Sequence, residues 1–150
     1  MMGVDRDMGD EMLALNRAFE KAFASNDDND SVVELLACMG EELGCDRISI
    51  FEENSEGFCD NTYEWCAPGV IREQVLLQHM AVESFDSWHD RLLNREIIVI
   101  RNVEEIKDRD VHIYRMFQDQ DIHSAIVSLL AFHGSTFGFC IFENPGEEVL

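Results

Sequence analysis

The chain has 150 residues, of which 46% are hydrophobic, and its 31 acidic and 11 basic side chains give a formal net charge of −20. This size predicts a single domain that can bury a core. The negative charge repels nucleic-acid phosphates and anionic lipids, so we expect no nucleic acid and no membrane among the partners. Apolar runs are far shorter than the roughly 20 residues of a membrane span, and the acidic start predicts no secretory leader. We therefore expect a cytoplasmic protein.

Two helices are predicted before the first strand. An amphipathic helix over residues 8–24 is indicated by apolar residues at helical spacing, namely Met12, Leu15, Phe19, Ala22 and Phe23. The acidic turn at residues 26–30 has the composition of a calcium loop but lacks its glycine and bidentate glutamate, so we interpret it as a solvated turn. Ser31 and Glu34 have capping-box spacing, which predicts the start of a second helix, and Gly44 is placed to end it.

From Asp46 to Phe51 the apolar residues alternate with polar ones, which predicts a strand, and residues 58–66 return as a second strand after a polar loop. Residues 70–95 are mixed, with a short helix at 87–94, and residues 97–101 form a third strand. A helix is predicted over 110–120, with Ile113, Tyr114 and Phe117 on its buried side. Residues 122–132 and 136–143 form a hairpin, and 147–150 look like the start of another helix. This order predicts an α+β domain with an antiparallel sheet.

Catalytic and metal-binding patterns are absent from the sequence. The five cysteines contain no C-x-x-C pair, and Cys59 and Cys66 lie seven residues apart on one predicted strand, which places them on opposite faces. These features argue against structural zinc. A transition metal or haem held by a histidine stays open beside ordinary hydrogen-bonding roles for His79, His89, His112 and His123. No nucleophile elbow, phosphate loop or H-E-x-x-H occurs, so we expect no enzyme activity.

Four stretches together resemble the GAF domains of bacterial signalling proteins, especially those joined to domains that make or break down cyclic-di-GMP. They are residues 43–51, 60–70, 120–127 and 138–145, and the resemblance covers about residues 30–145 in the expected order. The chain departs from the family at Leu129-Leu130-Ala131, where members commonly carry an apolar-Pro-Leu stretch. It also lacks the N-K-x-n-F-x-x-x-D-E pattern of cyclic-nucleotide binders and a clear counterpart of the bilin-attachment cysteine.

The resemblance implies a GAF-like fold, related to the profilin-like and PAS folds, with a central antiparallel sheet of five to six strands and helices on both faces. It divides the chain into an N-terminal helix and acidic turn at 1–28, the GAF domain at 29–145, and the start of a truncated C-terminal linker helix at 146–150. The terminal helices would pair in a homodimer.

The function implied is that of a regulatory sensory domain. It would bind a small ligand of unknown identity beneath residues 70–95 and 110–120, and pass the signal through its terminal helices to an output domain that is not part of this sequence. Two alternatives stay open: a dimerisation module without a ligand, and a redox or metal sensor using Cys59, Cys66 or Cys140.

Candidate ligand-binding residues combine aromatic rings with one cation. Phe85 and Trp88 lie three residues apart in the expected roof of the site, so they share one side if that segment is helical. Trp65 ends the second strand near the same region, and Arg101 ends the third strand, where it could meet an anionic group. An apolar lining with a few polar groups is typical of small-molecule sites.

Overall fold

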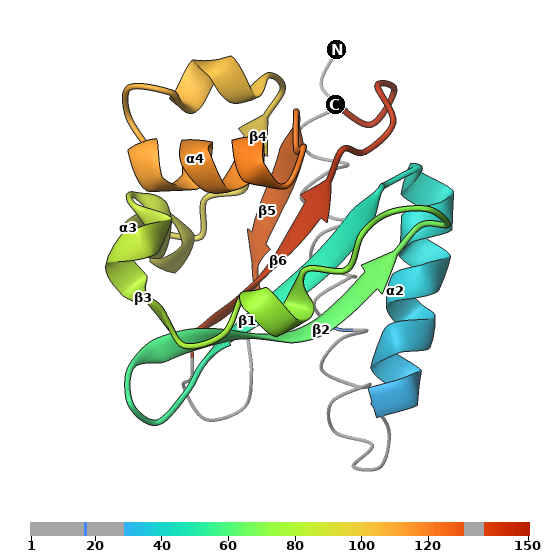
Figure 1. Ribbon diagram of the computed structural model, residues 1–150, viewed down its shortest axis with the longest axis horizontal. Helices are drawn as coiled ribbons and strands as arrows, with labels where there is room; N and C mark the ends of the chain where they lie inside the picture. The colour runs from blue at the N-terminus through green and yellow to red at the C-terminus, as the bar shows by residue number, and fades with distance from the viewer. Residues whose placement is uncertain (1–16, 18–28, 131–136) are drawn as a thin grey trace.

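The computed structural model describes residues 17, 29–130 and 137–150. Apart from Arg17, which is helical, the helix predicted over residues 8–24 lies outside the described residues, as does the turn predicted at 133–135. A single six-stranded sheet in the order β3-β2-β1-β6-β5-β4 forms the centre of the described part, and every neighbouring pair is antiparallel. Helix α2 covers one face of this sheet, and α3, α4 and three short 3-10 helices cover the other (Figure 1). The predicted α+β class is confirmed.

Five of the six strands lie close to the predicted bounds. They are β1 (Arg47–Glu53), β2 (Phe58–Cys66), β3 (Met80–Ala81), β4 (Ile98–Ile100), β5 (Ala125–Leu129) and β6 (Gly138–Glu143). Five of these strands were predicted individually. The sixth, β3, pairs with β2 over two residues only, and two residues are too short to produce a recognisable alternation of apolar and polar side chains.

Helix α2 (Asn29–Leu43) buries Val32 and Leu36 against the strand residues Ile48, Ile50 and Phe142. Their four-residue spacing places both helix residues on the face toward the sheet. The helix ends before Gly44, whose φ of 67° lies in the left-handed region, as predicted. The predicted start was wrong, because α2 begins at Asn29 and Ser31 lies inside its first turn. Asn and Asp in the preceding acidic turn are equally good N-cap types, so the capping-box pattern did not fix the boundary.

The opposite face of the sheet carries the short helices η1 (Gln74–Leu76), η2 (Val82–Phe85) and η3 (Val103–Ile106), together with α3 (Trp88–Leu93) and α4 (Val111–Asp119). Aromatic rings fill the layer between them and the sheet. Phe51 stacks on Phe139 with 5.3 Å between ring centroids, and Phe85, Trp88 and Phe117 pack around this pair. Of the predicted buried side of α4, Ile113 and Phe117 are buried, whereas Tyr114 is half-buried.

A β-bulge in β2 changes which side chains face which layer. Ile50 pairs with Tyr63 but Phe51 pairs with Asn61, so Thr62 is an extra residue. An extra residue reverses the alternation of side chains beyond it. Cys59 lies in the aromatic layer, and Cys66 lies across from Arg47 with its thiol near Ile71 O, on the same face of the sheet. The prediction that Cys59 and Cys66 lie on opposite faces was therefore wrong.

The last residues return to the start of the sheet. Gly146 N donates to Leu43 O at 2.9 Å, and residues 147–149 form a turn where the sequence indicates a helix. Continuation into a linker helix stays a prediction. Among the described residues, no helix is long and apolar enough to cross a membrane.

Candidate functional site

Two adjoining cavities lie between residues 69–84, which we call the roof segment, and helix α4. Their volumes are about 250 and 620 Å³, and Glu73, Asp119 and Gln120 line both. We call the two together the groove. The smaller cavity is completed by Asp46, Arg47, Gly69, Val70, Ile71, Asp121 and Asn144. The larger one is completed by Leu76, Leu77, Met80, Ser84, His112, Arg115 and Met116. The groove lies on the face of the sheet opposite α2, where the family resemblance places a ligand.

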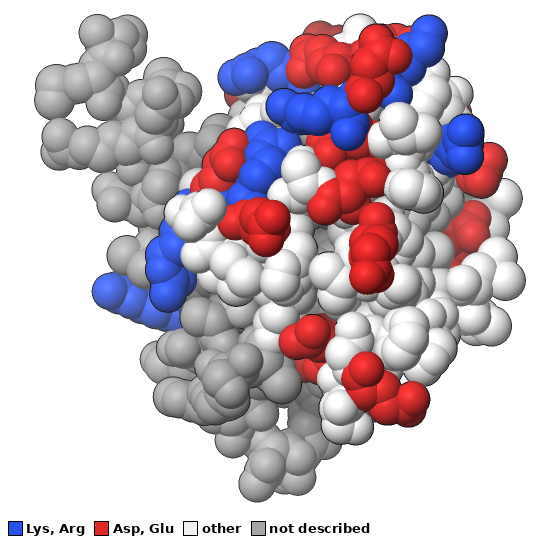
Figure 2. Space-filling view, turned by 90° about the vertical axis from the view of Figure 1, so that its left-hand side faces the viewer, with Lys and Arg blue, Asp and Glu red and all other residues white. Residues whose placement is uncertain are grey.

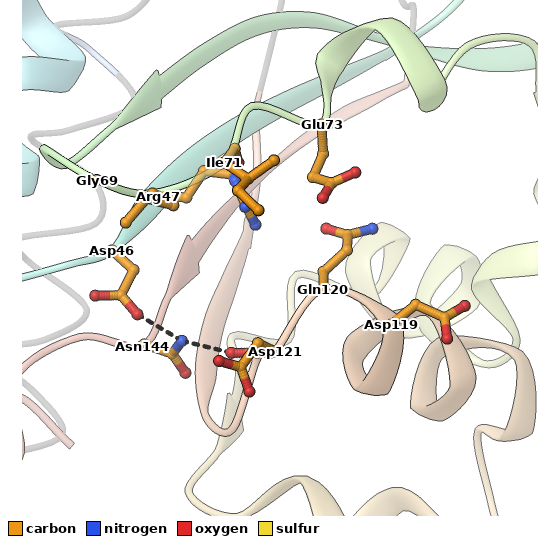
Figure 3. A pocket seen from close by; sticks show the side chains of 10 residues that line it. Asp46, Arg47, Gly69, Ile71, Glu73, Asp119, Gln120, Asp121 and Asn144 are labelled. Atoms are coloured by element: carbon orange, nitrogen blue, oxygen red, sulfur yellow. Dashed lines mark hydrogen bonds between the residues drawn. The ribbon is translucent and has the colours of Figure 1, made fainter.

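Polar side chains line the smaller cavity at both of its ends (Figure 3). At one end Asn144 Nδ2 donates to Asp46 Oδ2 at 2.8 Å and to Asp121 O at 3.1 Å, which joins the ends of β1 and β6 to the loop after α4. At the other end Glu73 points from the roof segment toward Gln120. No hydrogen bond joins these two side chains in the described part of the chain, so the gap between them is open to a ligand.

The Arg47 side chain reaches into the smaller cavity from β1 beneath Ile71, but buried carboxylates hold it. Its Nη1 donates to Glu143 Oε1 at 2.5 Å, and its Nε lies 3.7 Å from Glu64 Oε2. Ser49 Oγ donates to the second oxygen of Glu143 at 3.0 Å. Arg47 and both glutamates are almost completely buried. The guanidinium charge is thus matched within the protein and is not available to an anion in the groove.

This buried cluster also attaches the roof segment to the sheet. Arg47 Nη2 donates to Ile71 O at 2.6 Å, and Glu73 N donates to Glu64 Oε2 at 3.0 Å. The mostly exposed Arg72 places its Nε 3.5 Å from Glu64 Oε1. Two of these contacts are made by backbone atoms of the roof segment, Ile71 O and Glu73 N. The position of the roof segment therefore depends on the charges of Arg47 and Glu64.

Burial raises the pKa of the Glu143 carboxyl to about 7, against the lowering effect of Arg47 and Ser49. The neighbouring Glu64 carboxylate adds to the increase. The cost of burying the carboxylate outweighs its ion pair with Arg47, because Glu143 is almost completely buried. The protein therefore favours the protonated form of Glu143 more than water does.

The larger cavity has an apolar floor and a polar rim. Leu77 is buried at its base, and Met80 and Met116 are half-buried beside it. The roof segment also exposes large apolar side chains to solvent, with Val75 at 88% and Leu76 at 76% exposure. An apolar part of a ligand would cover surface of this kind.

Hydrogen bonds to two carboxylates join the loop before α3 to the start of α4. Asp86 Oδ2 accepts from Ile113 N at 2.9 Å, which satisfies a free amide in the first turn of α4. In return Asp110 Oδ1 accepts from Ser87 N at 3.1 Å and from Ser87 Oγ at 2.7 Å, just before α3. The two helices therefore keep a fixed relative position.

The four residues predicted to bind ligand are distributed over three places. Phe85 and Trp88 come together, with 6.3 Å between ring centroids, but they are 2% and 0% exposed in the aromatic core. Trp65 lies on the other face of the sheet and packs on Gly40 of α2. Arg101 is exposed and donates from Nε to Leu150 O at 3.1 Å. None of the four lines the groove as described, and their contact with a ligand stays a prediction.

Sequence reasoning missed Arg47, Glu64 and Glu143 as a group. A signal was present, because Arg47 and Ser49 share the strand face of Phe51, and Glu143 follows Phe139 and Ile141 in the same phase. Charged residues in core-facing positions of a strand indicate a buried ion pair or a site. Asp119 and Gln120 carry no such signal, since polar residues at a helix end are ordinary.

The three cysteines considered for redox sensing have poorly reactive thiols. Burial raises the pKa of Cys59 to about 11, and it raises the pKa of Cys140 well above its ordinary value. Burial also raises the pKa of Cys66. A raised pKa lowers the fraction of reactive thiolate. No group of three or more His, Cys, Asp or Glu side chains suited to a metal ion occurs within the described residues.

The fold is that of GAF domains. The chain is similar to the far-red absorbing dark state of JSC1_58120g3 with bound biliverdin IXa, with 17% identity and a TM-score of 0.63 over 89% of this chain and 85% of that one. It is also similar to the blue-light absorbing form of the Thermosynechococcus elongatus PixJ GAF domain, with 16% identity and a TM-score of 0.61 over 98% and 74%.

A third similar structure is the photoproduct state of GAF3 from Slr1393 of Synechocystis, with 16% identity and a TM-score of 0.59 over 74% of this chain and 72% of that one. No protein-family model and no curated protein sequence matches the chain.

Proposed function

We propose that this chain is a bacterial, cytoplasmic GAF-type sensory domain that binds a small organic ligand in the groove between the roof segment and α4. The observation that carries the proposal is the groove itself, because its two cavities adjoin on the face opposite α2 and share three polar residues. The volume of the larger cavity, about 620 Å³, is within the usual range of small-molecule sites. The GAF fold and the biliverdin bound by one similar structure support a ligand-binding role.

The proposed mechanism is a shift between two conformations of the roof segment. Ligand binding changes this equilibrium only if the ligand prefers one conformation. Arg47 links Ile71 O of the roof to Glu143 at the end of β6, so a displaced roof changes the contacts of the last strand. From there the signal passes through the terminal segments to an output domain, of the kind that makes or breaks down cyclic-di-GMP.

A thermal-shift screen of small metabolites tests the proposal. Gln120 borders both cavities, so Gln120→Trp fills the groove, whereas Gln118→Trp places the same ring on an exposed part of α4. We expect compounds that raise the melting temperature of the parent and of Gln118→Trp, and not of Gln120→Trp. If every stabilising compound acts equally on both variants, the ligand site lies elsewhere.

A further inference from the structure

Acidic side chains outnumber basic ones in the lining of the groove. Four carboxylates line the smaller cavity or its border with the larger one: Asp46, Glu73, Asp119 and Asp121. Two of them, Glu73 and Asp119, have no side-chain hydrogen bond or ion pair with any described residue. Free carboxylates beside a cavity attract cations and repel anions.

The basic residues of the groove compensate these carboxylates only in part. Arg47 is neutralised by Glu143, and its Nε is too enclosed by protein to meet a ligand. Arg115 lines the larger cavity together with Glu73 and Asp119, and it is one cation beside the four carboxylates of the groove. On the side of the molecule that carries α3 and α4, acidic and basic side chains gather together in the upper part of the view (Figure 2). Near these helices, Arg91 is paired with Glu96 and Arg109 with Asp110.

The charged groups beneath the cavity pair with one another, Glu64 and Glu143 with Arg47 and Arg72. Glu64 is completely buried, and its Oε1 accepts no hydrogen bond among the described residues although Arg72 Nε lies 3.5 Å away. The other oxygen of Glu64 holds the backbone of Glu73. These paired charges leave the free carboxylates of the groove without a spare cation from below.

We infer that the ligand is an elongated organic cation, with an ammonium or guanidinium group attracted by the carboxylates of Glu73 and Asp119 and an apolar body over Leu77, Met80 and Met116. This inference rests on the proposed function, because it assigns a ligand class to the same groove. The Gln120 amide oxygen offers the head group a neutral acceptor beside the two carboxylates. A dicarboxylate such as biliverdin is disfavoured by the same charges, since it would bring further negative groups to the uncompensated carboxylates.

The test compares three probes of matched length by isothermal titration calorimetry at about pH 8, where the amine is charged. They are 4-phenylbutylamine, the anion 5-phenylpentanoate and the neutral 4-phenylbutanol. We expect the amine to bind at least roughly tenfold more tightly than the anion, with the alcohol between them, and to weaken as salt is raised. Tighter binding of the anion or of biliverdin than of the amine, or no binding of the amine, overturns the inference.

Charge-matched variants separate the groove from the overall field of the protein. Glu73→Gln with Asp119→Asn removes two charges at the groove, and Glu56→Gln with Asp108→Asn removes two from exposed positions elsewhere. We expect amine binding to weaken roughly tenfold in the first double variant and less than about twofold in the second. Equal effects contradict the inference. If the anion binds and Gln120→Trp abolishes its binding, the groove is a ligand site and only the assigned class is wrong.

Discussion

Arg47 shows how one residue can join a sheet, a cavity and a covering segment. It lies in a strand position whose neighbours in phase are Ser49 and Phe51, and it is almost completely buried. Burying a charge is costly unless partners satisfy it, and here the partners come from β2, β6 and the roof segment. Such a residue ties the position of the roof to the protonation of the carboxyls around it.

Replacement of Glu143 by glutamine should change how stability depends on pH. The pKa of Glu143 is raised from 4.5 to about 7, so the folded state holds the proton more tightly than the unfolded state does. The resulting stabilisation is complete below about pH 4.5 and is lost as the pH rises through about 7. A glutamine does not ionise, so the stability of Glu143→Gln relative to the parent should rise by about 2 kcal/mol between pH 5 and pH 8.

Urea unfolding across this pH range measures the difference, and the exposed Glu56→Gln variant is the control for loss of one charge. The groups that face Glu143 are Arg47, Ser49 and Glu64, and all three are retained. Parallel curves for the parent and Glu143→Gln would show that this carboxyl is already ionised at pH 5.

At the scale of elements, the sequence predicted regular structure better than side-chain direction. The alternation of side chains in β1 and β6 and the apolar spacing in α2 are local sequence patterns. The type and approximate bounds of these three elements could therefore be predicted. The bulge at Thr62 depends on how β1 pairs with β2, and no residue type in β2 predicts it. Without the bulge, Trp65 would share the face of Cys59, near the predicted site; with it, Trp65 packs on α2.

The groove was predictable in location but not in composition. Residues 70–95 and the helix over 110–120 were expected to cover a site, and the cavities lie between these two segments. Phe85 and Trp88 instead fill the core, because large rings gain more free energy from complete burial than from lining a partly open cavity. What remains at the surface of the groove is polar, and polar loop residues are ordinary in any sequence.

The packing of Trp65 on α2 predicts an unusual effect of Gly40→Ala. In a helix interior this change normally stabilises by about 1 kcal/mol. A Cβ at Gly40 would lie 2.1 Å from the Trp65 ring, so we expect destabilisation by about 2 kcal/mol instead. In a Trp65→Leu background the same substitution should be neutral or stabilising. Chemical denaturation of the four proteins measures both effects, and equal costs in the two backgrounds would contradict the packing.

At the scale of the whole molecule, the first predicted helix is expected to pair two copies of the chain. Its apolar stripe includes Leu15 and Phe19, and such a stripe is stable only when it is covered. Sedimentation should show a dimer for the parent and for Ala14→Glu, which lies opposite the stripe in a helix. Phe19→Glu should shift the protein to monomer. A monomeric parent at millimolar-range concentration would contradict the prediction.

The expected absence of nucleic-acid binding also belongs to the whole molecule. A net charge of −20 opposes approach of a phosphate backbone, although a local basic surface can overcome net charge. The same field favours the approach of a cation to the groove, so the local contribution of Glu73 and Asp119 has to be measured against charge-matched variants.

Native mass spectrometry of the freshly purified protein tests the ligand site most directly. The parent and Gln118→Trp should each carry an additional small-molecule mass that denaturation releases, and Gln120→Trp, in which the groove is filled, should carry none. Retention of the same mass by Gln120→Trp at the level of the parent would contradict a ligand site between the roof segment and α4.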